Sequence, residues 1–293
     1  DGLFDHPAGL SPSAASQLLS LLPPGPVLDP FIGGGAVALA ARRAGRPVIG
    51  RDVSEAALCV TRARCWLPDP TEAMAYRQNA RATEDPAFAG AVCGPPQLPE
   101  PMRSAVEATR AAAPTPRARD RLIDAAIRAW RDERGRVPPG TPAPDLARAD
   151  ARFLTLAQPV PGILTSPPYP GVYDYDRWTS RLRHARGQHG DIEQEIGARR
   201  GFRAGLAAAS LQWRAATMAW TAAAARALCP GGRMVIVIGD GPRPDGPIDT
   251  RAASISAAEQ AGLRLLEAAT AQPGSRPSPR REHALLFERP NVY

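Results

Sequence analysis

The stretch that decides the fold is PVLDPFIGGGAVALAARRAG, residues 26–45 of the 293-residue chain. Its first six residues predict a short buried strand, the three glycines allow a tight turn, and the Ala-rich remainder predicts a helix that ends at Gly45. A second apolar run over residues 47–50 follows at once, and Ser54 with Glu55 behind it is typical of a helix start. Strand, helix, strand and helix in this order predict a parallel sheet with helices on both faces.

The same alternation returns in the second half of the chain. The predicted elements are short strands at 151–154 and 162–166, a long Ala-rich helix at about 202–228, a buried strand at 233–240, a helix near 252–261 and strands near 263–269 and 283–288. Because the last two strands follow one another as in a hairpin, we expect an antiparallel edge added to the parallel sheet.

A proline-rich insertion, residues 68–148, separates the two halves, and its pattern predicts one amphipathic helix at about 117–134. Residues 1–67 and 149–293 then form the α/β domain around it. The insertion holds twelve Arg and eleven acidic residues, and this near neutrality argues against a nucleic-acid recognition domain. We expect a helical lid or a dimer element, which makes a homodimer the predicted assembly; recognition is the alternative role.

The chain is basic, with 36 basic against 29 acidic residues and a formal charge of +7, and every basic residue is Arg. Most of this charge is diffuse, as expected for a GC-rich coding sequence. The largest local surplus lies in residues 171–214, with eight Arg against five acidic residues, so a nucleic-acid backbone is expected there. No apolar run reaches the roughly 18 residues of a membrane span, and Cys and His are too scattered for a metal site. We expect a cytoplasmic protein with neither a membrane partner nor a metal.

Two aspartates stand where the first two predicted strands end. Asp29 precedes the glycines, and Asp52 lies 17 residues beyond Gly35, a spacing that also fits dinucleotide-binding folds. In either case the glycines let the backbone approach a ligand closely, and Asp52 accepts hydrogen bonds from ribose hydroxyls. A carboxylate at Asp29 repels a pyrophosphate and attracts a cation, which favours a cofactor with a cationic end.

The most specific motif is Thr165-Ser166-Pro167-Pro168-Tyr169, directly after a predicted buried strand. The Ser166 hydroxyl and the Pro167 carbonyl are two acceptors that can hold an NH2 group, and the Pro-Pro unit fixes the direction of the carbonyl. Tyr169 offers a flat face on which an extruded base can stack. The segment contains no Cys, so it predicts direct transfer to an exocyclic amine without a covalent nucleophile.

The DPFIGGG segment at 29–35 resembles the cofactor motif D-P-F-x-G-x-G of the DNA amino-methyltransferases, and SPPY at 166–169 resembles their catalytic motif. The Ser form with a preceding Thr is most similar to the N4-cytosine enzymes; Asp and Asn forms lean toward N6-adenine and toward guanine-N2 RNA enzymes. The resemblance covers roughly residues 3–67 and 149–293. It implies an α/β, Rossmann-like class I methyltransferase fold, a seven-stranded sheet with an antiparallel last strand, and S-adenosyl-L-methionine as cofactor.

The resemblance also implies roles for single residues. Cofactor contacts fall on His6, Pro7, Asp29, Pro30, Phe31, Gly33, Gly35, Asp52, Asp150 and Thr165, and the catalytic positions are Ser166, Pro167, Pro168 and Tyr169. The substrate candidates Tyr173, Tyr175, Arg199 and Arg200 either line the base pocket and hold phosphates, or pack under the loop and start a helix. Gly239-Asp240 resembles a further motif that borders the target base, or forms a turn.

Together these features predict an S-adenosylmethionine-dependent methyltransferase that acts on an exocyclic amino group. DNA is the expected partner and cytosine N4 the leading target, exposed by base flipping. The alternatives are an N6-adenine DNA or guanine-N2 RNA methyltransferase, an N-methyltransferase of a small molecule or peptide, and an inactive nucleic-acid-binding module.

Overall fold

The computed structural model describes residues 10–82, 98–113, 115–188, 195–241, 248–271 and 281–291. Two of the predicted cofactor residues, His6 and Pro7, lie outside the described residues, so their role stays a prediction.

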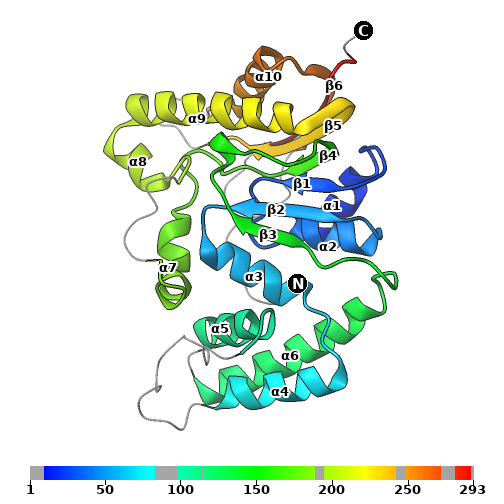
Figure 1. Cartoon of the computed structure of the whole chain (residues 1–293). Helices are drawn as coiled ribbons and strands as arrows, with labels where there is room; N and C mark the ends of the chain where they lie inside the picture. The colour runs from blue at the N-terminus through cyan, green and yellow to red at the C-terminus, as the bar shows by residue number, and fades with distance from the viewer. Residues whose placement is uncertain are drawn as a thin grey trace.

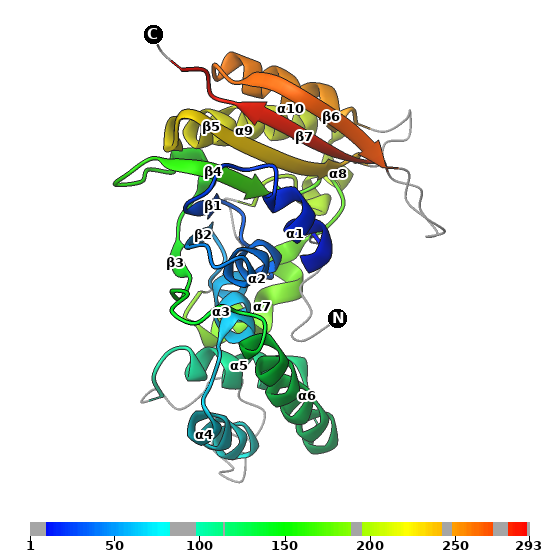
Figure 2. The same ribbon diagram turned by 90° about the vertical axis from the view of Figure 1, so that its right-hand side faces the viewer.

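A seven-stranded sheet with the strand order β3-β2-β1-β4-β5-β7-β6 forms the centre of the molecule (Figures 1 and 2). Its strands are β1 Val27–Asp29, β2 Val48–Asp52, β3 Asp145–Arg148, β4 Val160–Thr165, β5 Leu228–Gly239, β6 Arg264–Ala271 and β7 Glu282–Glu288. Neighbouring strands are parallel, except that β7 is antiparallel to both β5 and β6. This topology confirms the predicted fold, the Rossmann-like sheet of the class I methyltransferases with its antiparallel last strand.

Strand β5 shows how the sheet separates two hydrophobic cores. Met234, Ile236 and Ile238 are buried in one core, whereas Val235 and Val237 are buried in the other. Successive side chains of a strand point to opposite faces, so a continuous apolar run is what a strand covered on both sides requires. The sheet is therefore buried on both faces, as the sequence predicts.

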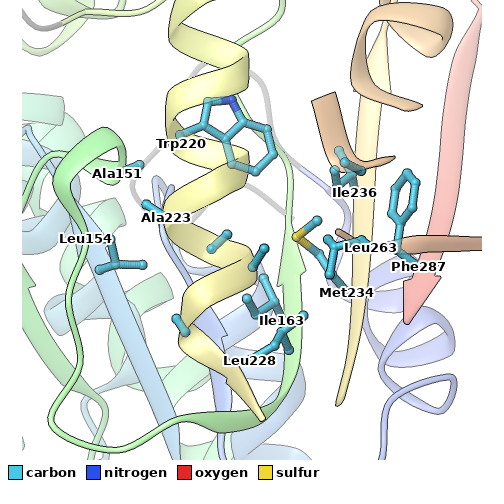
Figure 3. Packing of buried hydrophobic residues seen from close by; sticks show 14 of the residues in the cluster. Ala151, Leu154, Ile163, Trp220, Ala223, Leu228, Met234, Ile236, Leu263 and Phe287 are labelled. Atoms are coloured by element: carbon cyan, nitrogen blue, oxygen red, sulfur yellow. The ribbon is translucent and has the colours of Figure 1, made fainter. Parts of the chain in front are cut away.

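Helices cover both faces of the sheet. The helices that flank it are α1 Pro12–Leu19, α2 Ala36–Arg43, α3 Glu55–Cys65, α9 Leu206–Ala227 and α10 Thr250–Gln260, whereas α7 Tyr175–Ala185 packs on α3 and α8 Arg199–Ala204 packs on α9. Figure 3 shows the core on the α9 side, where Trp220 and Ala223 pack on the face that carries Ile163 and Met234. On the other face α1 and α2 contribute to the core around Val235.

The insertion folds into helices that share a core with α3. These helices are α4 Pro70–Arg81, α5 Met102–Ala112 and α6 Pro116–Arg134. Trp130 of α6 meets Trp66, at the end of α3, with ring centroids 5.0 Å apart, and Tyr76 of α4 at 4.8 Å. The sequence predicts α6 almost to the residue but neither α4 nor α5, because proline-rich stretches surround those two helices.

The strand predicted at 151–154 is wrong. Ala151–Phe153 forms a short 3-10 helix, η2, and the edge strand β3 is Asp145–Arg148, inside the range that the sequence assigns to the insertion. No residue of β3 is fully buried. An edge strand without a buried face shows little alternation of apolar and polar residues. The apolar residues that follow β3 therefore resemble a strand more closely than β3 itself does.

The long helix predicted at 202–228 is also interrupted. Gly205, with an extended backbone (φ −173°), separates α8 from α9. Residue 228 already belongs to β5, which therefore begins earlier than predicted. The other predicted strands and helices of the α/β domain match the observed ones to within a few residues, as expected at element ends.

Candidate active site

The first predicted cofactor residue, Asp29, is buried at the carboxyl end of β1, beside β4. Its Oδ1 accepts hydrogen bonds from the Phe31 amide at 3.0 Å and from the Thr165 hydroxyl at 2.7 Å. Burial raises the pKa of Asp29 to about 7, although the two hydrogen bonds oppose the shift. Thr165 thus ties this carboxyl group to the strand that leads into the SPPY motif.

The glycine turn after β1 is held in place by α3. Gly33 and Gly35 have φ values of +48° and +80°, in the region that favours glycine. The Thr61 hydroxyl donates to the Gly33 carbonyl at 2.8 Å, and Arg64 donates to the Gly34 carbonyl at 2.6 Å. A Cβ at Gly35 would lie 2.8 Å from the Thr61 side chain. The turn is therefore both conformationally and sterically restricted to glycine.

Asp52 closes the other side of this turn from the end of β2. Its Oδ2 accepts from the Gly33 amide at 3.0 Å, and its Oδ1 accepts from the Ser54 amide at 2.9 Å. Burial raises the pKa of Asp52 to about 6, and the negative charge of Asp52 adds to the upward shift at Asp29. Two acids with raised pKa values, the buried Asp29 and the half-buried Asp52, therefore flank the glycine turn.

Two other predicted cofactor residues make structural contacts. Asp150 accepts from the Arg152 backbone amide at 2.9 Å, which caps η2, and forms an ion pair with the Arg152 guanidinium at 2.6 Å. The Phe31 ring meets Trp220 of α9 edge-on, with centroids 5.3 Å apart. Pro30 lies between Asp29 and Phe31 in the turn after β1. The predicted contacts of these residues with a cofactor stay predictions.

The SPPY motif forms the loop that leaves the carboxyl end of β4. Pro167 is buried, whereas Ser166, Pro168 and Tyr169 are half-buried. The Tyr169 hydroxyl lies 3.5 Å from a carboxylate oxygen of Glu282 on β7. Burial raises the pKa of Tyr169. Because Thr165 donates a hydrogen bond to Asp29, the motif lies next to the first predicted cofactor-binding residue.

Two glycines of β5 and its end allow this loop to lie against the sheet. A Cβ at Gly239 would lie 2.6 Å from the Tyr169 ring, and a Cβ at Gly241 would overlap the Pro170 carbonyl. The two glycines are two residues apart, so they face the same side. Their missing side chains provide the space for the loop, a role that the sequence motif at Gly239-Asp240 does not reveal.

The predicted substrate tyrosines lie beside the same loop. Tyr173 and Tyr175 have ring centroids 5.5 Å apart. Burial raises the pKa of Tyr175, and Tyr169, Tyr173 and Asp52 are close enough to add to the shift. The Tyr175 backbone amide donates to Glu195 at 2.7 Å, which fixes the start of α7.

The predicted substrate arginines differ from one another. Arg200 forms an ion pair with Glu195 at 2.9 Å, and its backbone amide donates to Asp174 at 2.8 Å. It therefore joins the start of α8 to the loop before α7. Arg199 is exposed, and its backbone amide donates to the Tyr173 carbonyl at 3.0 Å. Only Arg199 of the two presents its side chain to solvent without an ion pair among the described residues.

A buried polar cluster lies behind the end of β5. Asp240 accepts from Thr250, His283 and Arg281, at 3.1, 3.2 and 3.0 Å, and the other ring nitrogen of His283 interacts with Thr270 at 2.9 Å. Asp240 is therefore engaged in joining β5, α10 and β7. This geometry gives the residue a structural role in the sheet edge.

An apolar cleft of about 510 Å³ lies between η2, the segment 195–198 and α9. Ile196, Phe202 and Trp213 line it, with Arg152 and Glu195 among its polar residues. None of the predicted site residues that the structure describes lines this cleft. Also within the described ranges, no group of His, Cys, Asp and Glu side chains could hold a metal ion, and no helix is long and apolar enough to cross a membrane.

Solved structures that are similar to this chain share little of its sequence. TrmN from Thermus thermophilus is 18% identical over 97% of this chain, with a TM-score of 0.43; the chain spans 50% of that protein's length. A methyltransferase from Bacillus halodurans is 12% identical, with 96% of this chain and 100% of that chain covered and a TM-score of 0.46. The glycopeptide N-methyltransferase MtfA complexed with S-adenosyl-L-methionine is 9% identical, with 98% and 91% covered and a TM-score of 0.43.

At these identities the likeness concerns the fold alone. No family model matches the sequence, and no curated protein matches it. The chain has the fold of the class I methyltransferases, and its chemistry is inferred from its own residues.

Several residues of the site were not singled out from the sequence. Thr61 and Arg64 brace the glycine turn, Glu195 bonds to the start of α7 and to Arg200, and Glu282 reaches the SPPY loop. Except for Arg200, which is five residues from Glu195, each partner lies 20 or more positions away in the sequence. The helical spacing of Thr61 and Arg64, three residues apart on one helix face, is the one local signal that could have indicated a shared target.

Proposed function

We propose that this protein is an S-adenosyl-L-methionine-dependent methyltransferase that methylates an exocyclic amino group, with cytosine N4 in DNA as the leading substrate. The observation that carries the proposal is the bond of 2.7 Å between Thr165 and Asp29. This bond joins the residue before Ser166 to Asp29, a predicted cofactor-binding acid. The groups that would accept hydrogen bonds from the amine and the residues that would bind the cofactor therefore belong to one site.

The residues around the glycine turn fit this cofactor. Bound S-adenosyl-L-methionine supplies an electrophilic methyl group on a sulfonium. A buried Asp29 with a raised pKa gains from a cationic partner, because the cation favours the charged carboxylate. Asp52 at the end of β2 is placed to accept hydrogen bonds from ribose hydroxyls while it holds the Gly33 amide.

The SPPY loop supplies what an aromatic amine needs. The Ser166 hydroxyl and the Pro167 carbonyl accept hydrogen bonds from the two N–H groups of the amine. They thereby hold the nitrogen lone pair toward the methyl group. Tyr169, supported by the bare face of β5 at Gly239, offers its ring to a base. The Ser form of the motif, with Thr165 before it, supports cytosine over adenine through the family resemblance.

The charge near the loop supports a nucleic-acid substrate. Of the eight Arg in residues 171–214, Arg183, Arg186 and Arg200 form ion pairs. The others, which are exposed, are Arg177, Arg181, Arg199, Arg203 and Arg214. Exposed arginines beside a base site suit phosphate contacts.

The decisive experiment is mass spectrometry of nucleosides from the DNA of cells that express the protein, alongside transfer of labelled methyl groups by purified protein. We expect N4-methylcytosine above the level of cells without the protein. N6-methyladenine would change the target base, and label in RNA or in a small amine would change the substrate class. No transfer to any of them, together with no cofactor binding in calorimetry, would refute the proposal.

Ser166→Ala separates the chemistry from cofactor binding. Loss of one positioned acceptor should lower transfer by about a hundredfold or more, while the affinity for S-adenosyl-L-methionine stays within a few fold. Both are measured on the same purified variant, by methyl transfer and by calorimetry. A variant that loses cofactor affinity as strongly as transfer would contradict the role given to Ser166.

A further inference from the structure

We infer that Glu282 is a positioning residue, which holds the Tyr169 hydroxyl so that the Tyr169 ring is fixed in place for the substrate base. This inference rests on the proposed function of the SPPY loop. It assigns a role in the site to β7, the strand farthest along the chain.

The sheet register brings Glu282 to the loop. Glu282 pairs directly with Gly239 across the antiparallel β5–β7 ladder, and directly opposed residues have side chains on the same face. The face of Gly239 is the one against which the Tyr169 ring lies. The Glu282 carboxylate therefore reaches the hydroxyl end of that ring, at 3.5 Å.

The neighbours of Glu282 on β7 point away from the loop. Arg281 and His283 bond to Asp240, at 3.0 and 3.2 Å. Because side chains alternate along β7, Arg281 and His283 point to the face where Asp240 lies, whereas Glu282 points to the opposite face. The exposed position of Glu282 lets it be replaced without disturbing the core.

The contact between the two side chains has one direction. An ionised carboxylate accepts hydrogen bonds and cannot donate, so the Tyr169 hydroxyl donates its single proton to Glu282. The hydroxyl end of the ring is then held by β7, while the ring itself lies against Gly239 of β5.

The fixed ring matters because Tyr169 is the residue on which the proposed base stacks. A distance of 3.5 Å is at the long limit of a hydrogen bond, and such bonds at catalytic sites often tighten only when the substrate is bound. Glu282 thus fixes the position of the stacking ring.

The first test needs neither cofactor nor substrate. The chain has five Tyr, so a protein labelled at the tyrosine ring carbon that bears the hydroxyl gives few NMR signals, and Tyr169→Phe identifies the one from Tyr169. Glu282→Ala should shift the Tyr169 signal. The matched control is Glu267→Ala, an exposed acid on the neighbouring strand β6, which should leave it in place.

The second test is kinetic. Glu282→Ala should lower kcat by roughly tenfold or more, as expected for loss of a hydrogen bond to a charged group, with KM for S-adenosyl-L-methionine unchanged. Glu282→Gln, which keeps an acceptor but loses the charge, should restore part of kcat. In a Tyr169→Phe background Glu282→Ala should have no further effect, because the hydroxyl that connects the two is gone.

The outcomes separate this inference from the proposed function. A wild-type protein that neither transfers a methyl group nor binds S-adenosyl-L-methionine refutes the proposed function. A wild-type protein with transfer, whose Tyr169 signal and kcat are both unmoved by Glu282→Ala, overturns the role of Glu282. An equal loss of kcat in the Tyr169→Phe background also overturns it, because Glu282 would then act by another route.

Discussion

At the scale of single residues, the site contains two acids, Asp29 and Asp52, that form no ion pair within the described part of the chain. Asp29 is held by a hydroxyl and a backbone amide, and Asp52 by two backbone amides. Neutral donors only partly offset the cost of desolvating a carboxylate, so both pKa values rise, to about 7 and about 6. An acid in this condition gains the most when a cation binds beside it.

This arrangement predicts a pH dependence of cofactor affinity. Below pH 7 Asp29 is increasingly protonated in the free protein, and binding of a cation must first remove that proton. The affinity for S-adenosyl-L-methionine should therefore fall by up to about tenfold per pH unit on going from pH 7 to pH 6, with proton release on binding. Calorimetry at several pH values in two buffers measures both quantities.

Asp29→Asn is the control for this pH dependence. The variant should bind more weakly at pH 8 and lose the step near pH 7, while the step from Asp52 near pH 6 remains. A wild-type affinity that is the same at pH 6 and pH 8 would contradict the assignment of Asp29.

Residues that act through local spacing could be predicted from the sequence. Asp29, the glycines and Asp52 follow strand ends, and the structure places all of them around one turn. The partners that brace them could not be predicted, because Thr61 reaches Gly33 from another helix and Glu282 reaches Tyr169 across 113 positions of sequence. Such contacts depend on strand order and register, which periodicity alone does not fix.

At the scale of elements, the SPPY loop and strand β5 form one packed unit. The residues of the loop predict it, whereas the space in which it lies exists because Gly239 and Gly241 have no side chains. Propensity arguments treat a glycine in a strand as a weak point or a bulge. Here the glycines mark a close approach of two segments, which only the sheet order reveals.

Gly239→Ala tests this packing. Because the new Cβ would lie 2.6 Å from the Tyr169 ring, the loop must shift, and methyl transfer should fall by about tenfold or more. Cofactor affinity should remain within about twofold, since the turn between β1 and α2 is not involved. Gly135→Ala is the matched control, because its Cβ has only an ordinary contact with the Asp132 carbonyl. Equal activity of both variants would show that the loop does not depend on β5.

At the scale of the whole molecule, the insertion is continuous with the α/β domain. One core contains Val60 and Ala63 of α3 together with Val106 of α5 and Ile123 of α6. Arg186 of α7 adds polar contacts to Glu100 and Ser104 of the α5 region. The chain composition indicated a separate segment, because proline content reports the loops between the helices and not the faces that the helices bury.

A shared core predicts a single unfolding transition. Trp130 is buried and donates to the Ala63 carbonyl at 2.8 Å, so Trp130→Ala should lower the free energy of unfolding by about 3 to 5 kcal/mol. Denaturant unfolding followed by circular dichroism should show one transition shifted as a whole. Met74→Ala, at a side chain 63% exposed on α4, should change stability by less than about 0.5 kcal/mol. A separate early transition in Trp130→Ala would indicate that the insertion unfolds independently.

The position of β7 has a consequence for the order in which the protein matures during synthesis. β7 follows the other six strands in the chain, yet it lies inside the sheet, between β5 and β6. The ribosome therefore releases the glycine turn, Asp29 and Asp52 long before the strand that carries Glu282. A nascent chain can complete its cofactor half early, but the setting of Tyr169 must wait until β7 has inserted.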